Sequence, residues 1–321
     1  MKSRRMTAEI PYHPRDLSAE LHIPLPDVRR DDWEPRPVGG RQCYPTATSV
    51  RFIDASTIVC CSQLARRIYL IRFDLDARRH EILDEADTVF AGGTTGTDLC
   101  DIDGFGHVVT SNCGTGGMSL YLCRDDRIAF VRDLPTGTTR SCRGAAFLDR
   151  NTVVGVFDRG RPGVGFFNVD SMMRLLHVET TAPAKDVCFL SDRRCIVLVT
   201  DGRPDRHAQE RYSSSALLVD FDLRAGSYEI VRQATYPGGQ IDAGVVRAGR
   251  LYAVDSNRGT FIESDAGTLE TIRETGGYNF PHGIDIGYGM LAVTSYGDNS
   301  IDIARIPDDY RRVPEGPIER A

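Results

Sequence analysis

The sequence predicts an all-β fold, a six-bladed β-propeller built from four-stranded antiparallel blades. The first observation behind this prediction is a set of three short strands that recurs six times between residues 44 and 306. The second is the period, because successive copies begin 50, 45, 42, 57 and 40 residues apart. A period of about 40–50 residues with several strands per unit is typical of propellers. The third is an alternating strand near the N-terminus that can complete the last copy.

The clearest copy lies at residues 280–306. Its first strand, residues 283–286, ends in a glycine-rich turn at residues 287–289. Its second strand, residues 290–296, is a nearly continuous apolar run, as expected of a strand that is buried on both faces. After a polar turn, residues 301–306 alternate isoleucines with small or polar residues. This order of short strands and turns predicts a β-meander.

The other copies repeat this order of strands. In chain order they span residues 48–73, 98–122, 143–169, 185–221 and 242–263. Fourth strands are expected after three of them, at residues 80–83, 128–131 and 228–231. One such unit cannot bury both faces of its sheet alone, whereas neighbouring units around a ring can.

Residues 17–25 are expected to close the ring. The period-two pattern of a half-buried strand is seen in the apolar residues Leu17, Ala19, Leu21, Ile23 and Leu25. The last copy lacks a fourth strand, because the tail at residues 307–321 is rich in proline and charge. We expect the N-terminal strand to pair in that last blade, which leaves no sheet edge exposed there. The polar segment 27–40 would then lead into the first blade, and residues 1–321 would form a single domain.

The composition limits the partners and the compartment. A net charge of −6 and a pI near 5.7 argue against a nucleic-acid partner, which would need a basic surface. No window approaches a membrane span, and the basic start is not followed by the apolar core of a signal peptide. The nine cysteines are odd in number and mostly lie inside strands, which favours free thiols in the cytoplasm. The sequence does not predict the oligomeric state.

Chemistry is expected at one mouth of the central channel, where the first strands of all blades begin. The aligned first-strand positions should converge there in a ring of Thr48, Asp98, Arg143, Lys185, Asp242 and His282. The ends of the second strands would form a wider shell of Ser62, Asn112, Asp158, Asp201, Asp255 and Tyr296. Loop 201–215 and the glycine-rich residues 91–96 would approach the same face, the loop as a lid or as a plain surface insertion. Ligands favour such concave, polar openings.

A purely structural interpretation of the ring stays open. Asp98 would lie beside Arg143 and Lys185 beside Asp242, so each acid could neutralise a neighbouring base. Buried charges are usually paired for that reason. The ring is then either a static ionic plug or a functional site.

The repeats resemble six-bladed propellers of the NHL, TolB-like and gluconolactonase (strictosidine-synthase-like) group. The resemblance rests on the segments 280–285, 251–256 and 291–300 and covers residues 44–306. It implies the propeller fold, and for activity it implies either a lactonase, an acid–base enzyme or a non-catalytic NHL-like binding module. In the strictosidine-synthase branch a channel carboxylate acts as acid or base, a role that Asp242 or Asp98 could take.

The gluconolactonase branch holds a divalent cation with oxygen ligands, and this sequence departs from that pattern. Thr48 occupies the glutamate position, and Arg143 and Lys185 stand where oxygen ligands would be needed. Two cations oppose a hard metal ion, so we expect no metal and no other cofactor. A metal held by Asp98, Asp242 and His282, as in a metal-dependent lactonase, remains the alternative.

The function expected from the sequence is binding of a small anionic metabolite, with metal-independent hydrolysis, lactone opening or isomerisation. Arg143 and Lys185 would hold its carboxylate or phosphate. His282, next to Asp242, would transfer a proton, with Asp98 as a further acid–base candidate. The remaining residues expected to contact the substrate are Tyr296 and Asn112, as hydrogen-bond partners of an oxyanion, together with Thr48 and Asp255. The competing hypothesis is a non-catalytic binding module that uses its outer loops.

Overall fold

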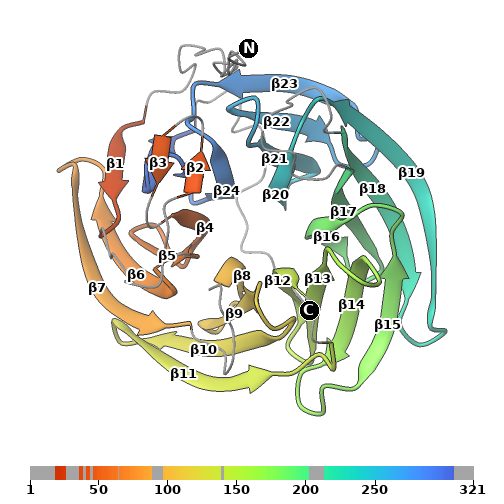
Figure 1. Cartoon of the computed structure of the whole chain (residues 1–321). Coiled ribbons are helices and arrows are strands. Elements are labelled where there is room, and N and C mark those ends of the chain that lie inside the picture. Colours follow the sequence, from red (N-terminus) through yellow and green to blue (C-terminus); the bar gives the residue numbers. More distant parts are fainter. Residues whose placement is uncertain are drawn as a thin grey trace, which may run out of the picture.

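The computed structural model is a closed ring of six four-stranded antiparallel sheets around a central axis, which confirms the predicted six-bladed propeller (Figure 1). It describes residues 19–26, 36–38, 41–43, 46–63, 65–88, 97–138, 141–201 and 213–306. Every regular element in these ranges is a strand, and none of them contains a helix that could cross a bilayer.

The first three blades follow the chain outward from the axis. Blade one consists of β4 (Ala47–Phe52), β5 (Thr57–Ser62), β6 (Arg67–Asp74) and β7 (Arg79–Asp87). Blade two consists of β8 (Thr97–Ile102), β9 (His107–Asn112), β10 (Met118–Arg124) and β11 (Arg127–Leu134). Blade three consists of β12 (Cys142–Asp149), β13 (Thr152–Phe157), β14 (Gly163–Asn168) and β15 (Arg174–Glu179).

The last three blades continue the ring, and blade six takes its fourth strand from the N-terminal part of the chain. Blade four consists of β16 (Ala184–Ser191), β17 (Arg194–Asp201), β18 (Ser213–Asp222) and β19 (Ser227–Pro237). Blade five consists of β20 (Ile241–Arg247), β21 (Arg250–Asp255), β22 (Thr260–Asp265) and β23 (Thr271–Gly276). Blade six consists of β24 (Pro281–Gly287), β25 (Met290–Ser295), β26 (Ser300–Arg305) and the N-terminal β1 (Leu21–Pro24).

Strand β1 closes the ring in blade six, as the sequence predicts. It pairs antiparallel with β26, and Leu21 lies opposite Ile303 and Ile23 opposite Ile301. Leu21, Ile23 and Leu25 are buried, whereas the intervening His22 is exposed. Residues 17 and 18 of the expected strand, and the tail 307–321, lie outside the described residues. The period-two pattern is therefore the physical basis of closure: one face packs and the other meets solvent.

A short hairpin between β1 and blade one was not predicted. Strands β2 (Arg36–Val38) and β3 (Arg41–Cys43) pair antiparallel within the segment that we expected to be only a polar connection or the start of the blades. The residues between them are two glycines, a dipeptide typical of tight hairpins. Strands β2 and β3 are too short for the sequence to show an alternation of apolar and polar residues.

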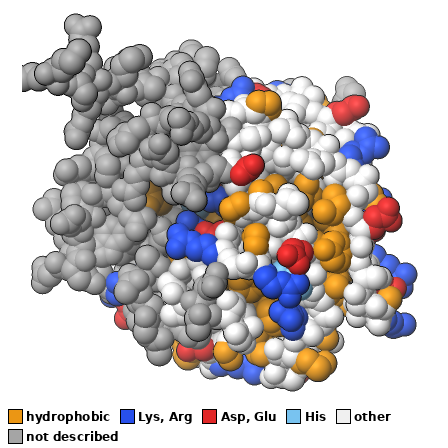
Figure 2. All heavy atoms as spheres, turned by 45° about the vertical axis from the view of Figure 1, so that its right-hand side comes forward, with side chains coloured by type: hydrophobic (Ala, Val, Ile, Leu, Met, Phe, Trp, Pro, Cys, Tyr) orange, Lys and Arg blue, Asp and Glu red, His pale blue; other side chains and the backbone are white. Residues whose placement is uncertain are grey.

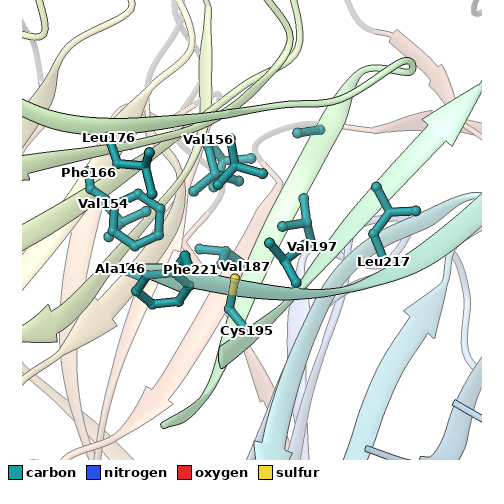
Figure 3. Close-up of a cluster of buried hydrophobic side chains, with 14 of the residues drawn as sticks. Ala146, Val154, Val156, Phe166, Leu176, Val187, Cys195, Val197, Leu217 and Phe221 are labelled. Carbon is teal, nitrogen blue, oxygen red and sulfur yellow. The ribbon is translucent and has the colours of Figure 1, made fainter. Parts of the chain in front are cut away.

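Six hydrophobic clusters fill the six junctions between neighbouring blades. The second strands of blades one, three and six are buried along their whole length, because each contacts a blade on either side. Figure 3 shows the cluster between blades three and four, where Val154 and Phe166 face Val197 and Phe221. Equivalent clusters lie at the other five junctions. Among the described residues each cluster combines side chains of at least two blades, so neighbouring blades stabilise one another.

The outer strands are longer and more exposed than the sequence indicates. The predicted fourth strands become β7, β11 and β19, and β15 and β23 are present as well. Strand β23 is mostly exposed, so it carries no buried stripe that periodicity could detect. Figure 2 shows the molecule turned so that the right-hand side of Figure 1 comes forward, and on this face hydrophobic side chains lie between charged ones. Tyr228, Ile230 and Val231 of β19 are among the exposed hydrophobic residues.

Candidate functional site

The ring residues predicted from the alignment lie at irregularities of the six innermost strands. The register of each first strand against its second strand skips a residue or two, between Ala47 and Ser49, Thr97 and Cys100, Cys142 and Gly144, Ala184 and Asp186, Ile241 and Ala243, and Pro281 and Gly283. The skipped positions contain Thr48, Asp98, Arg143, Lys185, Asp242 and His282. A bulge leaves its residue unpaired and redirects the side chain. All six predicted ring residues thus lie where the innermost strands of their blades begin, at the same end of the ring, which is called the mouth below.

Arg143 joins two carboxylates. Its Nη1 donates to Asp98 Oδ2 at 2.9 Å, and its Nε donates to Asp158 Oδ2 at 3.0 Å. Burial acts to lower the pKa of Arg143, but the nearby Cys113 and the two carboxylates outweigh it and hold that pKa well above its ordinary value. The two bonds use two of the five N–H groups of a guanidinium. Arg143 is therefore a fixed cation with donors left over.

His282 bridges blade six to blades one and two. Its Nδ1 lies 3.0 Å from the carbonyl oxygen of Thr48, and its Nε2 lies 3.5 Å from Asp98 Oδ1. The ring of Tyr296 stacks on the imidazole at a centroid distance of 5.5 Å and an angle of 25°. The structure thus places Asp98, rather than the expected Asp242, at Nε2.

Asp242 and Lys185 form the second charged pair of the ring. Lys185 Nζ lies 3.6 Å from Asp242 Oδ1, while Gln240 Nε2 contacts Asp242 Oδ2 at 2.8 Å and Ser256 Oγ contacts it at 2.6 Å. Burial acts to raise the pKa of Asp242, but Lys185, His282 and the bond from Ser256 outweigh it, so that pKa is lowered. Asp242 is accordingly a carboxylate that holds the ammonium of Lys185.

Three other predicted contact residues form hydrogen bonds within their own blades. Asn112 Oδ1 accepts from the backbone N–H of Gly114 in the turn after β9, and Thr48 Oγ1 donates to a carbonyl of β5. Asp255 Oδ1 accepts from the backbone N–H groups of Gln240 and Arg258. Burial raises the pKa of Asp255 in spite of these bonds. Residues 91–96 and 202–212, which include most of the expected lid, lie outside the described residues.

A deeper polar layer was missed by the sequence reasoning. Asp101, Asp186 and Asp285 lie on the innermost strands of blades two, four and six, and each accepts a backbone N–H from the innermost strand of the next blade. The donors are Phe147 at 3.0 Å, Gly244 at 3.0 Å and Phe52 at 2.8 Å. These carboxylates therefore tie neighbouring blades together in three alternate pairs.

Arg51 is the buried cation of this layer. Its Nη1 donates to the carbonyl oxygen of Ile284 at 2.9 Å, and its Nε lies 3.6 Å from Asp101. Burial acts to lower the pKa of Arg51, but Asp285, Asp101 and Asp186 raise it above its ordinary value. Burial raises the pKa of Asp186 to about 6, with Arg51 offsetting part of the effect. A charged residue inside an otherwise apolar first strand was the signal for this layer.

The described side chains limit other chemistry. In the described ranges no group of three or more His, Cys, Asp or Glu side chains is arranged to hold a metal ion. The eight cysteines whose side chains are described are free thiols. Burial raises the pKa of Cys142, which lies next to Arg143, to about 12, so this thiol is not an activated nucleophile.

Comparisons with known proteins show the fold. No family model and no curated protein matches the sequence. Among solved structures, the chain is similar to the WD40 β-propeller domain of Doa1, at 10% identity and a TM-score of 0.57, over 92% of this chain and 98% of that one. It is also similar to the hydrazine synthase of Kuenenia stuttgartiensis, at 8% identity and a TM-score of 0.57, over 81% of this chain and 96% of that one. Similarity at such identities extends to the propeller architecture and not to activity.

Proposed function

We propose that the channel mouth binds a small anionic metabolite and that His282 exchanges a proton with it. The observation that carries this proposal is an asymmetry of burial. The cationic side chains of Arg143 and Lys185 are 28% and 17% exposed, whereas Asp98 and Asp242 beneath them are 4% and 5% exposed. A ligand that approaches the mouth therefore meets cations that buried carboxylates hold in place.

The chemistry of these cations suits a carboxylate or phosphate. A guanidinium fixed by two carboxylates is pre-organised, and among the described residues none accepts a hydrogen bond from its Nη2. Lys185 adds a point charge with three donors, of which the 3.6 Å contact to Asp242 uses at most one. His282 lies at the same mouth with Asp98 as its carboxylate partner. The proposed reaction class is metal-independent hydrolysis, lactone opening or isomerisation.

The resemblance to NHL, TolB-like and gluconolactonase propellers belongs to this proposal, since it supplies the lactone-opening option. A cytoplasmic location and the absence of nucleic-acid and membrane partners belong to it as well. The acidic composition supports the absence of a nucleic-acid partner, the free thiols support the cytoplasm, and the lack of a long apolar window supports the absence of a membrane partner.

The test compares Lys185→Gln with Arg194→Gln in a thermal-shift screen of carboxylate and phosphate metabolites. Arg194 is a matched control because it lies on β17 of the same blade, where it is exposed and paired with Asp220. We expect a ligand that stabilises the wild type and Arg194→Gln but binds Lys185→Gln about ten- to a hundredfold more weakly, the effect of losing one charged hydrogen bond. Equal binding by both variants, or no binding by the wild type, would refute the proposal.

A non-catalytic binding module is the second candidate, and the ion pairs favour it. Asp98 with Arg143 and Lys185 with Asp242 are mutually neutralised, as in a structural ring. His282→Gln separates the two functions. In an enzyme it should keep ligand affinity within severalfold and abolish turnover, whereas a wild type that binds its ligand without converting it would be a binding module.

A further inference from the structure

Phe280 has an unusual backbone conformation. Its φ angle is +54°, in the left-handed region that favours glycine, although it carries a large side chain. It stands two residues before His282, the ring residue of blade six. The described residues at the same position of other blades are Thr46, Ser141, Pro183 and Gln240. None of these four has a positive φ, so the strain is particular to blade six, and such strain clusters at active sites and ligand clamps.

Phe280 is one end of a row of three aromatic side chains at the mouth, which also contains Tyr296 and His282. The ring centroids of Phe280 and Tyr296 lie 5.8 Å apart, at an interplanar angle of 54°. Tyr296 in turn stacks on the imidazole of His282 at 5.5 Å, and both separations are favourable for aromatic pairs. The backbone N–H of Tyr296 also donates to the carbonyl oxygen of Phe280 at 3.0 Å, which holds these two residues together.

This aromatic row is not part of the packing between blades. Neither Phe280 nor Tyr296 belongs to any of the six hydrophobic clusters, whereas the nearby Tyr278 belongs to the cluster that joins blades five and six. Tyr296 and His282 are buried, but Phe280 is partly exposed. Phe280 therefore offers aromatic surface that the described blade junctions do not use.

The aromatic row and the cations occupy opposite sides of the mouth. Blade six, which carries the row, lies across the propeller from blade three, which carries Arg143, and Lys185 follows on blade four (Figure 1). The carboxylate of Asp98 lies between the two sides. Its Oδ2 accepts from Arg143 Nη1 at 2.9 Å, and its Oδ1 lies 3.5 Å from His282 Nε2. Because one carboxylate spans the gap, a ligand of modest size can reach both sides.

We infer that the ligand of the mouth is an anion that carries an aromatic group, and that Phe280 is the residue that selects this group. The inference rests on the proposed function, because Arg143 and Lys185 hold the acidic end of the ligand. The aromatic end packs on Phe280 at the blade-six side. Contact between two aromatic rings adds to the affinity gained from burying the ring of the ligand. The substrate class that fits is an arylalkanoic acid or an aryl phosphate.

The test compares phenylacetate with acetate, two acids that differ by the aromatic ring, in ligand titrations. The wild type should bind phenylacetate at least about tenfold more tightly than acetate, the effect of burying a phenyl group against an aromatic surface. Phe280→Gly should reduce this preference to about threefold or less. Glycine suits the φ angle of +54°, so the variant relieves the strain while it removes the aromatic ring. Its thermal midpoint should stay within about 3 °C of the wild type.

Tyr288→Gly is the matched control. Tyr288 is an aromatic residue of the same blade with the same φ of +54°, but it follows β24, at the opposite end of that strand from Phe280. Its replacement should leave the preference for phenylacetate unchanged. If Phe280→Gly loses more stability than expected, Phe280→Leu replaces it, because leucine keeps apolar volume but offers no aromatic face. That variant should lower the preference about two- to tenfold.

The outcomes separate this inference from the proposed function. Lys185→Gln should weaken the binding of both acids by the same factor and keep the preference, because it removes only a charge on the other side of the mouth. Equal binding of the two acids by the wild type, or a preference that persists at its wild-type size in the Phe280 variants, would overturn the inference and leave the proposed function standing. Binding of neither acid would count against both.

Discussion

Replacing Ile23 by alanine tests whether the N-terminal strand holds the ring closed. Ile23 is fully buried in β1 and belongs to the hydrophobic cluster between blades six and one. The substitution removes three carbons, each worth about 0.8 kcal/mol of transfer free energy. The cavity left between packed strands adds to this, so the free energy of unfolding should fall by about 3–4 kcal/mol.

The assay is denaturant unfolding of Ile23→Ala beside Ile230→Ala. Ile230→Ala is the matched control, because it removes the same atoms from another outermost strand, at a residue that is 43% exposed. Its loss should cost about 1 kcal/mol or less. Equal costs for the two substitutions, or a cost below about 1 kcal/mol for Ile23, would refute the conclusion that β1 is an integral part of blade six.

Three further predictions follow from packing and charge. Gly283→Ala would place a methyl group 2.6 Å from the carbonyl oxygen of Thr48, so we expect it to lose about 1–3 kcal/mol by thermal unfolding, while Gly104→Ala, with no atom within 4 Å, should lose less. Because burial raises the pKa of Asp186 from 3.8 to about 6, its folded state binds more protons than its unfolded state between these values, and its contribution to stability is lost as the pH rises through about 6. Unfolding measured at about pH 4.5 and 7.5 should show the wild type losing about 1–3 kcal/mol relative to Asp186→Asn, and a constant difference would contradict this. Arg51→Met should cost about 3–5 kcal/mol in denaturant unfolding, because it removes the buried cation that Asp101 and Asp186 share, while Asp285 keeps Arg247, and a neutral outcome would show that the deeper polar layer does not need Arg51.

The positions of the ring residues could be predicted from the sequence because the repeat is regular where each blade begins. Alignment of the copies predicts six ring positions, of which Thr48 and His282 are two. All six lie at register irregularities of the innermost strands. The pairs Asp98–Arg143 and Lys185–Asp242 also follow from adjacency around a ring. The repeat period therefore predicts both the fold and which residues lie together at the mouth.

The partners of individual atoms could not be predicted in this way. His282 belongs to blade six, and the sequence does not reveal that its Nε2 lies near Asp98 of blade two, beyond the adjacent blade one. Nor does it reveal that Asp158, at the end of a second strand, shares Arg143. Such contacts depend on side-chain directions at bulges, which period-two reasoning does not describe. Arg51 and Asp186 are charged residues within apolar strands, but they do not lie at the aligned position where each blade begins, so the repeat alone does not select them.

The pairing of β1 with β26 also sets the order of events during synthesis. The two strands are adjacent in space but distant in sequence: His22 and Asp302, which are in contact across them, are separated by 280 positions. The first five blades can form from neighbouring hairpins as the chain leaves the ribosome, whereas the sixth must wait for the final strand. Since bringing such distant segments together is slow, refolding should end in a late phase that a circular permutant joining residue 306 to residue 19 would abolish.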